Sequence, residues 1–238
     1  KVVTMLENEA IKQGKSLPEP VVRPIDPKAT AKSDWRELFK GIYLKRTLMI
    51  WVLWIAAYTI NNGMVTWLPT LYKTTFGMNT QDAIFYGWIT SAVGVLASVV
   101  CALTIDRVGR KRWYTWAFLL AVVPLVTLYF LGATTALQVT VFATATYAIL
   151  QTISFSLYLY SAELYPTRLR AIGTGFGSAW LRAGSSLGPV IVGFIVAGVG
   201  IQYVFLAFAA IAVLGGLMVA SGQLRLGDEA QAHQGLAD

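Results

Sequence analysis

The sequence predicts an all-α membrane protein whose six transmembrane helices form two inverted repeats of three helices each. Three observations predict this fold. Of the 238 residues, 56% are hydrophobic and only 13% are charged, whereas a soluble domain has about 25% charged residues. Six apolar segments are each long enough to cross a bilayer. The kind of side chain on these segments also repeats in the same order after the third segment.

Charge and cysteine content exclude several other classes of protein. The net charge is +7, but the basic residues lie between apolar segments, so we expect a bilayer and not nucleic acid as the partner. The single cysteine, Cys101, lies inside an apolar segment, and the single histidine, His233, lies near the C-terminus. We therefore expect no disulfide framework, no metal site and no cofactor.

Residues 1 to 46 are polar and rich in proline, which is typical of an extended linker. Near its end, Ser33 or Asp34 can cap a short helix. The apolar residues of that helix recur at helical spacing and are Trp35, Leu38, Phe39 and Ile42. The pattern predicts an amphipathic helix that lies on the membrane surface.

The six apolar segments define the transmembrane region, residues 47 to 221. They cover residues 47 to 68, 83 to 105, 113 to 131, 137 to 161, 171 to 197 and 201 to 221. Lys and Arg concentrate before the first segment and in the second and fourth connections, whereas only Lys73 lies in the first connection. Because positive residues stay on the cytoplasmic side, we expect both termini, with the tail at 222 to 238, to be cytoplasmic. The membrane expected is the inner or plasma membrane.

The segments are of three kinds, polar, rich in small residues and apolar, which recur in the same order. The fourth carries a polar stripe at spacings of three and four, formed by Thr140, Thr144, Tyr147, Gln151, Ser154 and Tyr158. The first carries a weaker polar face with Tyr58, Asn61 and Asn62. The second and fifth have stripes of small residues, which allow close helix packing, and the third and sixth are apolar all round. Since each unit has three helices, the second unit crosses the membrane in the opposite sense.

Inverted repeats are the architecture of secondary transporters, which bind their substrate near the bilayer midplane. The polar stripes then predict the lining of a cavity. The substrate-binding candidates on them are Tyr58, Asn61, Asn62, Thr144, Tyr147, Gln151 and Tyr158. The alternative is a polar helix interface without transport. We also expect the run Asn61-Asn62-Gly63 to interrupt the first helix, as in the discontinuous helices of transporters.

Arg182 is the charged residue inside a span, and it completes the set of substrate-binding candidates. It lies eleven residues after Ala171, which places it roughly 16 Å into the bilayer at 1.5 Å per residue. A charge at that depth should face the protein interior with a partner. Two roles remain open, namely a structural ion pair and a bidentate contact with a substrate carboxylate.

Two motifs stand at helix ends that we expect on the cytoplasmic side. One is Asp106-Arg107-x-Gly109-Arg110-Lys111, and the other is Glu163-x-x-Pro166-x-x-x-Arg170. Each places a carboxylate beside several cations, so ion pairs can hold the helix ends together in one conformation and separate in another. The gating candidates are Asp106, Arg107, Arg110, Glu163, Arg168 and Arg170. The alternative is that the cations only set the topology.

With these motifs, the sequence resembles the C-terminal half, helices seven to twelve, of a major facilitator superfamily transporter over essentially the whole chain. The first motif is similar to the signature loop between helices eight and nine, although Ala102 replaces the usual glycine. The second is similar to the motif after helix ten in the sugar-porter and organic-ion branches. The run Arg182-x-Gly184-x-x-x-Gly188-Pro189 is similar to helix eleven of the aromatic-acid and niacin-type symporters. The Gln-Gln pair typical of helix seven in sugar porters is absent.

The resemblance implies a twelve-helix transporter with its cavity between two halves, so the partner of this chain is a missing N-terminal half. The expected function is alternating-access transport of a small organic solute, an aromatic carboxylate such as nicotinate or benzoate, coupled to protons. No span carries an acidic residue or histidine, so the proton carrier lies in the other half or transport is uncoupled. A sugar or polyol symporter is the alternative, and a membrane-embedded enzyme or a channel is the alternative from another class.

Overall fold

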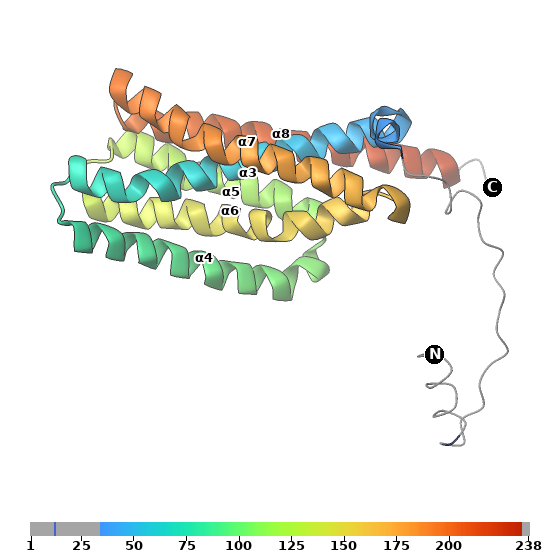
Figure 1. Ribbon diagram of the computed structural model, residues 1–238, viewed down its shortest axis with the longest axis horizontal. Helices are drawn as coiled ribbons and strands as arrows, with labels where there is room; N and C mark the ends of the chain where they lie inside the picture. The colour runs from blue at the N-terminus through green and yellow to red at the C-terminus, as the bar shows by residue number, and fades with distance from the viewer. Residues whose placement is uncertain (1–11, 13–33, 235–238) are drawn as a thin grey trace. The chain divides into compact units, whose positions relative to one another are not determined.

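The computed structural model describes Lys12 and residues 34 to 234, with side chains as far as Ser221. The chain divides into two compact units, Lys1–Lys32 and Ser33–Asp238, and the fold described here is that of the second. Most of the predicted linker lies outside the described residues. The second unit is a bundle of long helices that run side by side (Figure 1). Its elements are η1 Trp35–Phe39, α3 Gly41–Thr74, α4 Thr80–Val108, α5 Arg110–Leu131, α6 Ala136–Leu164, α7 Thr167–Gly198 and α8 Gln202–Gln234.

Six helices in the described part of the chain are long and apolar enough to cross a membrane, which confirms the predicted number. Each of the first five extends beyond its apolar segment, because polar caps and turns determine where a helix ends. Asn79 caps α4 by accepting a hydrogen bond from the Asp82 amide at 2.8 Å. Gly109, at a φ of +88°, separates α4 from α5. The helix α8 also continues past residue 221, where the sequence predicts a tail.

The segment before α3 differs from the predicted surface helix. Asp34 does cap a helix, since its Oδ1 accepts from the Arg36 amide at 3.0 Å, but this helix is the short 3₁₀-helix η1. Lys40 is extended, and Gly41 has a φ of +53°, a conformation that favours glycine. The chain therefore turns here, and Ile42 belongs to α3. Residues 41 to 46 are part of the bundle and not of the linker.

The predicted interruption at Asn61-Asn62-Gly63 is wrong, because α3 is continuous from Gly41 to Thr74. Gly63 serves close packing instead. A Cβ atom on Gly63 would lie 2.5 Å from the Phe208 ring and 3.3 Å from the backbone of Gly188 in α7. The small residue lets two helix backbones approach each other.

The packing of the helices has the symmetry of the predicted inverted repeat. Helix α3 packs against α7 and α8, just as α6 packs against α4 and α5. Helices α5 and α8 contact each other, as do α3 and α6. The set of contacts is therefore unchanged when the first three helices are exchanged for the last three. Helices α4 and α7 have no mutual contact and lie on opposite sides of the bundle (Figure 1).

Candidate functional site

A cluster of polar side chains joins α3 to α6 near the middle of the bundle. The Asn61 amide nitrogen donates to Ser154 Oγ at 2.9 Å and to Gln151 Oε1 at 3.2 Å. Asn61 is buried, and its Oδ1 atom has no hydrogen-bond partner among the described residues. A buried acceptor without a partner is costly in an apolar interior. This oxygen is thus available to a donor from water or from a ligand.

Trp54 extends this cluster toward the end of the bundle that carries Arg110. Its ring stacks on Tyr58 with centroids 5.5 Å apart and meets the edge of Tyr158 at 4.6 Å. Its Nε1 atom donates to Ser161 Oγ at 3.0 Å. The sequence places Trp54 beside the polar face of α3, but only Tyr58 and Tyr158 were among the substrate-binding candidates, and Ser161 was missed. Both continue their stripes at helical spacing, Trp54 four residues before Tyr58 and Ser161 three after Tyr158, which is the signal that could have found them.

The other candidates on these helices lie around the cluster in different settings. Tyr147 is half-buried against Gly94 of α4, where an added Cβ would lie 2.5 Å from its ring. Thr144 is buried, and its hydroxyl lies 2.7 Å from that of Thr90 in α4. Asn62 donates to the Tyr58 carbonyl one turn earlier, at 3.2 Å. The structure thus brings together Tyr58, Asn61, Gln151 and Tyr158, while Thr144 joins a contact between α6 and α4.

Arg182 stands at the midpoint of the 32-residue helix α7 and is exposed on the bundle. Four glycines of α7 occupy the opposite, buried face, which packs closely against α3; they are Gly173, Gly177, Gly184 and Gly188. We expected a partner in the protein interior, but no carboxylate lies within 4.0 Å of this guanidinium among the described residues. The bundle therefore leaves the charge of Arg182 free for a group outside it.

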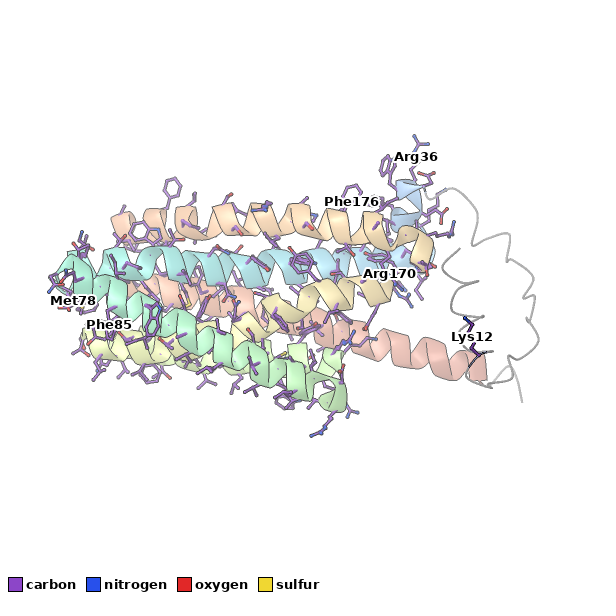
Figure 2. All side chains as sticks on the ribbon, turned by 60° about the horizontal axis from the view of Figure 1, so that its bottom comes forward. Lys12, Arg36, Met78, Phe85, Arg170 and Phe176 are labelled. Atoms are coloured by element: carbon purple, nitrogen blue, oxygen red, sulfur yellow. The ribbon has the colours of Figure 1, made fainter. Side chains whose placement is uncertain are left out.

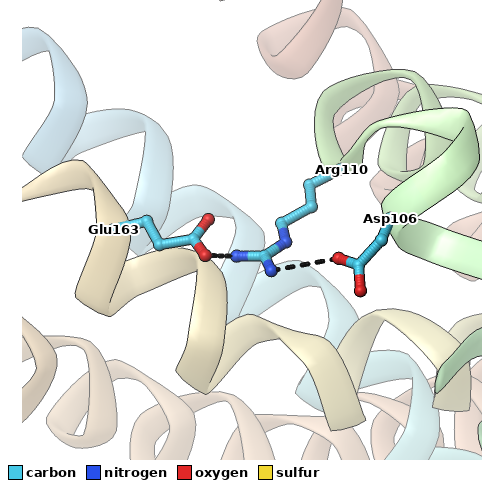
Figure 3. A network of polar contacts seen from close by, with 3 residues as sticks. All are labelled: Asp106, Arg110 and Glu163. Atoms are coloured by element: carbon cyan, nitrogen blue, oxygen red, sulfur yellow. Dashed lines mark hydrogen bonds and ion pairs between the residues drawn. The ribbon is translucent and has the colours of Figure 1, made fainter. Parts of the chain in front are cut away.

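The gating candidates meet at one end of the bundle, which we call the basic end and define by Arg110, Glu163 and Arg168. Arg110 lies between two carboxylates, pairing with Asp106 at 3.3 Å and with Glu163 (Figure 3). These contacts join the C-terminal ends of α4 and α6 through the first residue of α5. Figure 2 shows Arg36 and Arg170 at the same end, and Met78 and Phe85 at the opposite end.

The remaining basic candidates have different surroundings. Arg168 pairs with Glu37 of η1, with nitrogen–oxygen distances of 2.5 and 2.9 Å. Sequence reasoning missed Glu37, because nothing in its local pattern indicates a partner 131 residues away. Arg107 and Arg170 are exposed and have no ion pair within the described part of the chain. The ion pairs thus form two separate groups and not one.

A buried hydrogen bond supports the η1 connection. The hydroxyls of Thr47 and Tyr165 lie 2.9 Å apart, and Thr47 donates to the Leu38 carbonyl at 3.1 Å. Burial raises the pKa of the Tyr165 phenol above its usual value. The phenol therefore stays neutral at physiological pH and holds η1 against the connection between α6 and α7.

A six-helix bundle with inverted-repeat packing and polar side chains at its centre defines a class of membrane transport protein. Comparison with known families agrees. The family model of the Major Facilitator Superfamily matches residues 12 to 165, and the chain belongs to this superfamily. The relatives found by comparison are named as transport proteins, and the superfamily is one of transporters and not of enzymes.

The relatives give a more detailed comparison. The chain is 29% identical to the niacin transporter NiaP of Acinetobacter baylyi over 89% of its own length and 46% of that protein. It is 27% identical to the putative metabolite transport protein YdjK of Escherichia coli, over 93% of its own length and 48% of that protein. The chain is also 29% identical to organic anion transporter 3 of Mus musculus. This alignment covers 68% of the chain and 29% of that protein. The chain spans about half the length of the two bacterial relatives.

Proposed function

We propose that this chain forms the C-terminal half of a secondary active transporter for a small aromatic carboxylate such as nicotinate or benzoate. The observation that carries the proposal is Arg182, an exposed cation at the midpoint of α7 without a carboxylate partner among the described residues. A charge near the bilayer centre costs about 2.5 to 3.5 kcal/mol on insertion scales. A guanidinium that binds a carboxylate through two parallel hydrogen bonds offsets that cost.

The cluster between α3 and α6 suits the ring of such a solute. Gln151 and Asn61 offer amide groups, and Tyr58, Tyr147 and Tyr158 offer aromatic faces and hydroxyls beside them. Apolar pockets with a few polar groups that fix orientation are typical of small-molecule sites. The names of the relatives, which include a niacin transporter and an organic anion transporter, support the same substrate class.

The proposal assigns proton coupling to the half of the transporter outside this chain. The apolar segments of the six spans contain no acidic residue, and at the basic end Asp106 and Glu163 pair with Arg110 and Glu37 pairs with Arg168. A proton carrier is usually an intramembrane Asp, Glu or His. The cavity then lies between the two halves, with Arg182 facing it.

Uptake into proteoliposomes tests the proposal. The purified transporter that contains this chain should accumulate labelled nicotinate or benzoate faster with an inward proton gradient than without one. Labelled hexose is the matched alternative substrate. Gradient-driven uptake of hexose with no uptake of either carboxylate would replace the proposal with a sugar symporter, and ion conductance without any uptake would replace it with a channel.

Gln151→Ala should weaken binding of the carboxylate by about tenfold, because a hydrogen bond of about 1.4 kcal/mol is lost. Tyr147→Phe should weaken binding less, since it keeps the ring and removes only the hydroxyl. The measurement is equilibrium binding of labelled nicotinate to purified protein. Thr127→Ala is the control, because Thr127 is half-buried on α5 and bonds only to its own helix at the Val123 carbonyl. Unchanged affinity in both test variants would move the site elsewhere.

We further propose that the contacts of Arg110 with Asp106 and Glu163 form a gate at the cytoplasmic side, closed in the outward-facing state. An interaction equal in both states shifts no equilibrium, so these pairs must favour one of them. Asp106→Asn should therefore speed labelling of a cysteine introduced at the basic end and change the transport rate, with little change in substrate affinity. Lys73→Gln at the opposite end is the control. Equal labelling rates in Asp106→Asn and the parent protein would mean that the motif around Asp106 only sets the topology of the helices.

A further inference from the structure

Two cations at the basic end lack the carboxylate partners that Arg110 and Arg168 have. Arg46 of α3 and Lys111 of α5 are both half-buried, and neither has a carboxylate within 4.0 Å among the described residues. Removing a cation from water is unfavourable unless an opposite charge compensates for it. Binding of a negatively charged group beside these two side chains would therefore be favourable.

Arg46 is held in place but keeps a donor unused. Its Nη1 atom donates to the carbonyl of Leu164, the last residue of α6, at 3.0 Å. Its Cζ atom lies 6.0 Å from the centre of the Tyr43 ring. Its Nε atom is buried and has no acceptor within the described part of the chain. A guanidinium fixed in this way presents a free N–H group in a defined position.

Arg46 bonds the carbonyl of Leu164, and Arg110, the neighbour of Lys111 in the sequence, pairs with Glu163, so both cations lie at the last turn of α6. Tyr160 lies one turn before Leu164 on the same helix. Tyr160 is 4% exposed, and its hydroxyl is buried without a hydrogen-bond partner among the described residues. We call Arg46, Lys111 and Tyr160 the Arg46–Lys111 site. It combines two cations that lack a carboxylate partner with two buried polar groups that have no hydrogen-bond partner among the described residues.

We propose that the Arg46–Lys111 site binds a phosphate group. A phosphate oxygen can accept from the Arg46 Nε–H, the Lys111 ammonium and the Tyr160 hydroxyl, and its negative charge compensates for the two positive charges. Arg46 lies in the second turn of α3 and Lys111 in the first turn of α5, so both are near helix ends. Phospholipid headgroups occupy this depth in a membrane, and basic pockets between transmembrane helices bind them. Inorganic phosphate from solution offers the same chemistry.

Lipid binding to the purified protein, measured by native mass spectrometry, tests the site. Phosphatidylglycerol, which carries a net negative charge, and phosphatidylcholine, which does not, are titrated separately in neutral detergent. We expect selective binding of phosphatidylglycerol that Arg46→Gln and Lys111→Gln each weaken by about tenfold or more, the loss of one charge-assisted contact. Lys111→Arg should retain it. Arg112→Gln is the matched control, since Arg112 is the exposed neighbour of Lys111 in the sequence.

A parallel titration with inorganic phosphate separates the two sources. Thermal stabilisation by phosphate, lost in the same two variants, together with displacement of phosphatidylglycerol would assign the site to soluble phosphate. Phosphatidylglycerol binding that phosphate does not displace would assign it to a lipid headgroup. Binding that Lys111→Gln and Arg46→Gln leave unchanged, or that Arg112→Gln weakens equally, would overturn the proposal. If Arg46→Gln fails to fold because it loses the contact with Leu164, the result for Lys111→Gln alone decides the test.

Discussion

Replacing Arg182 with alanine should reduce carboxylate binding more than any other single change in this chain. Truncating one partner of a buried, hydrogen-bonded charge pair costs about 2 to 5 kcal/mol, which is about 30-fold to 4,000-fold in affinity. Arg182→Lys should bind with intermediate affinity, because it keeps the charge but loses the two parallel hydrogen bonds of the guanidinium. The measurement is equilibrium binding of labelled nicotinate to protein in detergent, followed by uptake in proteoliposomes.

Two comparisons make this result specific to the site. Lys73→Ala removes one positive charge from an exposed position in the last turn of α3, so it should leave binding unchanged. Size-exclusion profiles of all variants should match, since the side chain of Arg182 is exposed on the bundle. Normal nicotinate affinity in Arg182→Ala would leave this residue a structural role only, with its partner outside the described chain.

Gly188→Ala should be the most destabilising small substitution in the bundle. A Cβ on Gly188 would collide with the Thr59 carbonyl oxygen and lie 2.7 Å from the Gly63 nitrogen. These neighbours are backbone atoms of α3, so they cannot move aside as a flexible side chain would. Overpacking of this kind costs about 1 to 3 kcal/mol, and the corresponding fall in the thermal midpoint is about 2 to 12 °C for a chain of this size.

Gly175→Ala provides a matched control on the same helix. Gly175 lies in an exposed position of α7 where an added Cβ would meet nothing within 4 Å. Because alanine favours a helix over glycine by about 1 kcal/mol, this variant should be as stable as the parent or slightly more so. Thermal unfolding in detergent measures both. Equal midpoints for Gly188→Ala and Gly175→Ala would show that the contact between α3 and α7 can relax.

The number of helices, their repeat and their family were predictable because each depends on properties that neighbouring residues share. Hydropathy over about 20 residues identifies a span, and spacings of three and four identify which residues of α6 share a face, as for Gln151 and Ser154. The limits of the helices were less predictable. Gly41 and Asn79 set them through local backbone conformation and capping, which hydropathy does not detect.

The amino-acid sequence by itself determined that this is a membrane bundle of six helices from the Major Facilitator Superfamily, with polar residues along α6 and a charge at the middle of α7. Only the tertiary structure decided which distant residues meet. Asn61 bonds Gln151 and Ser154, Arg168 pairs with Glu37, and Gly63 packs against Gly188 in an unbroken helix. The physical reason is that such pairs depend on the rotation and relative height of two packed helices. Those quantities are set by all the side chains between the helices together, and no local pattern contains them.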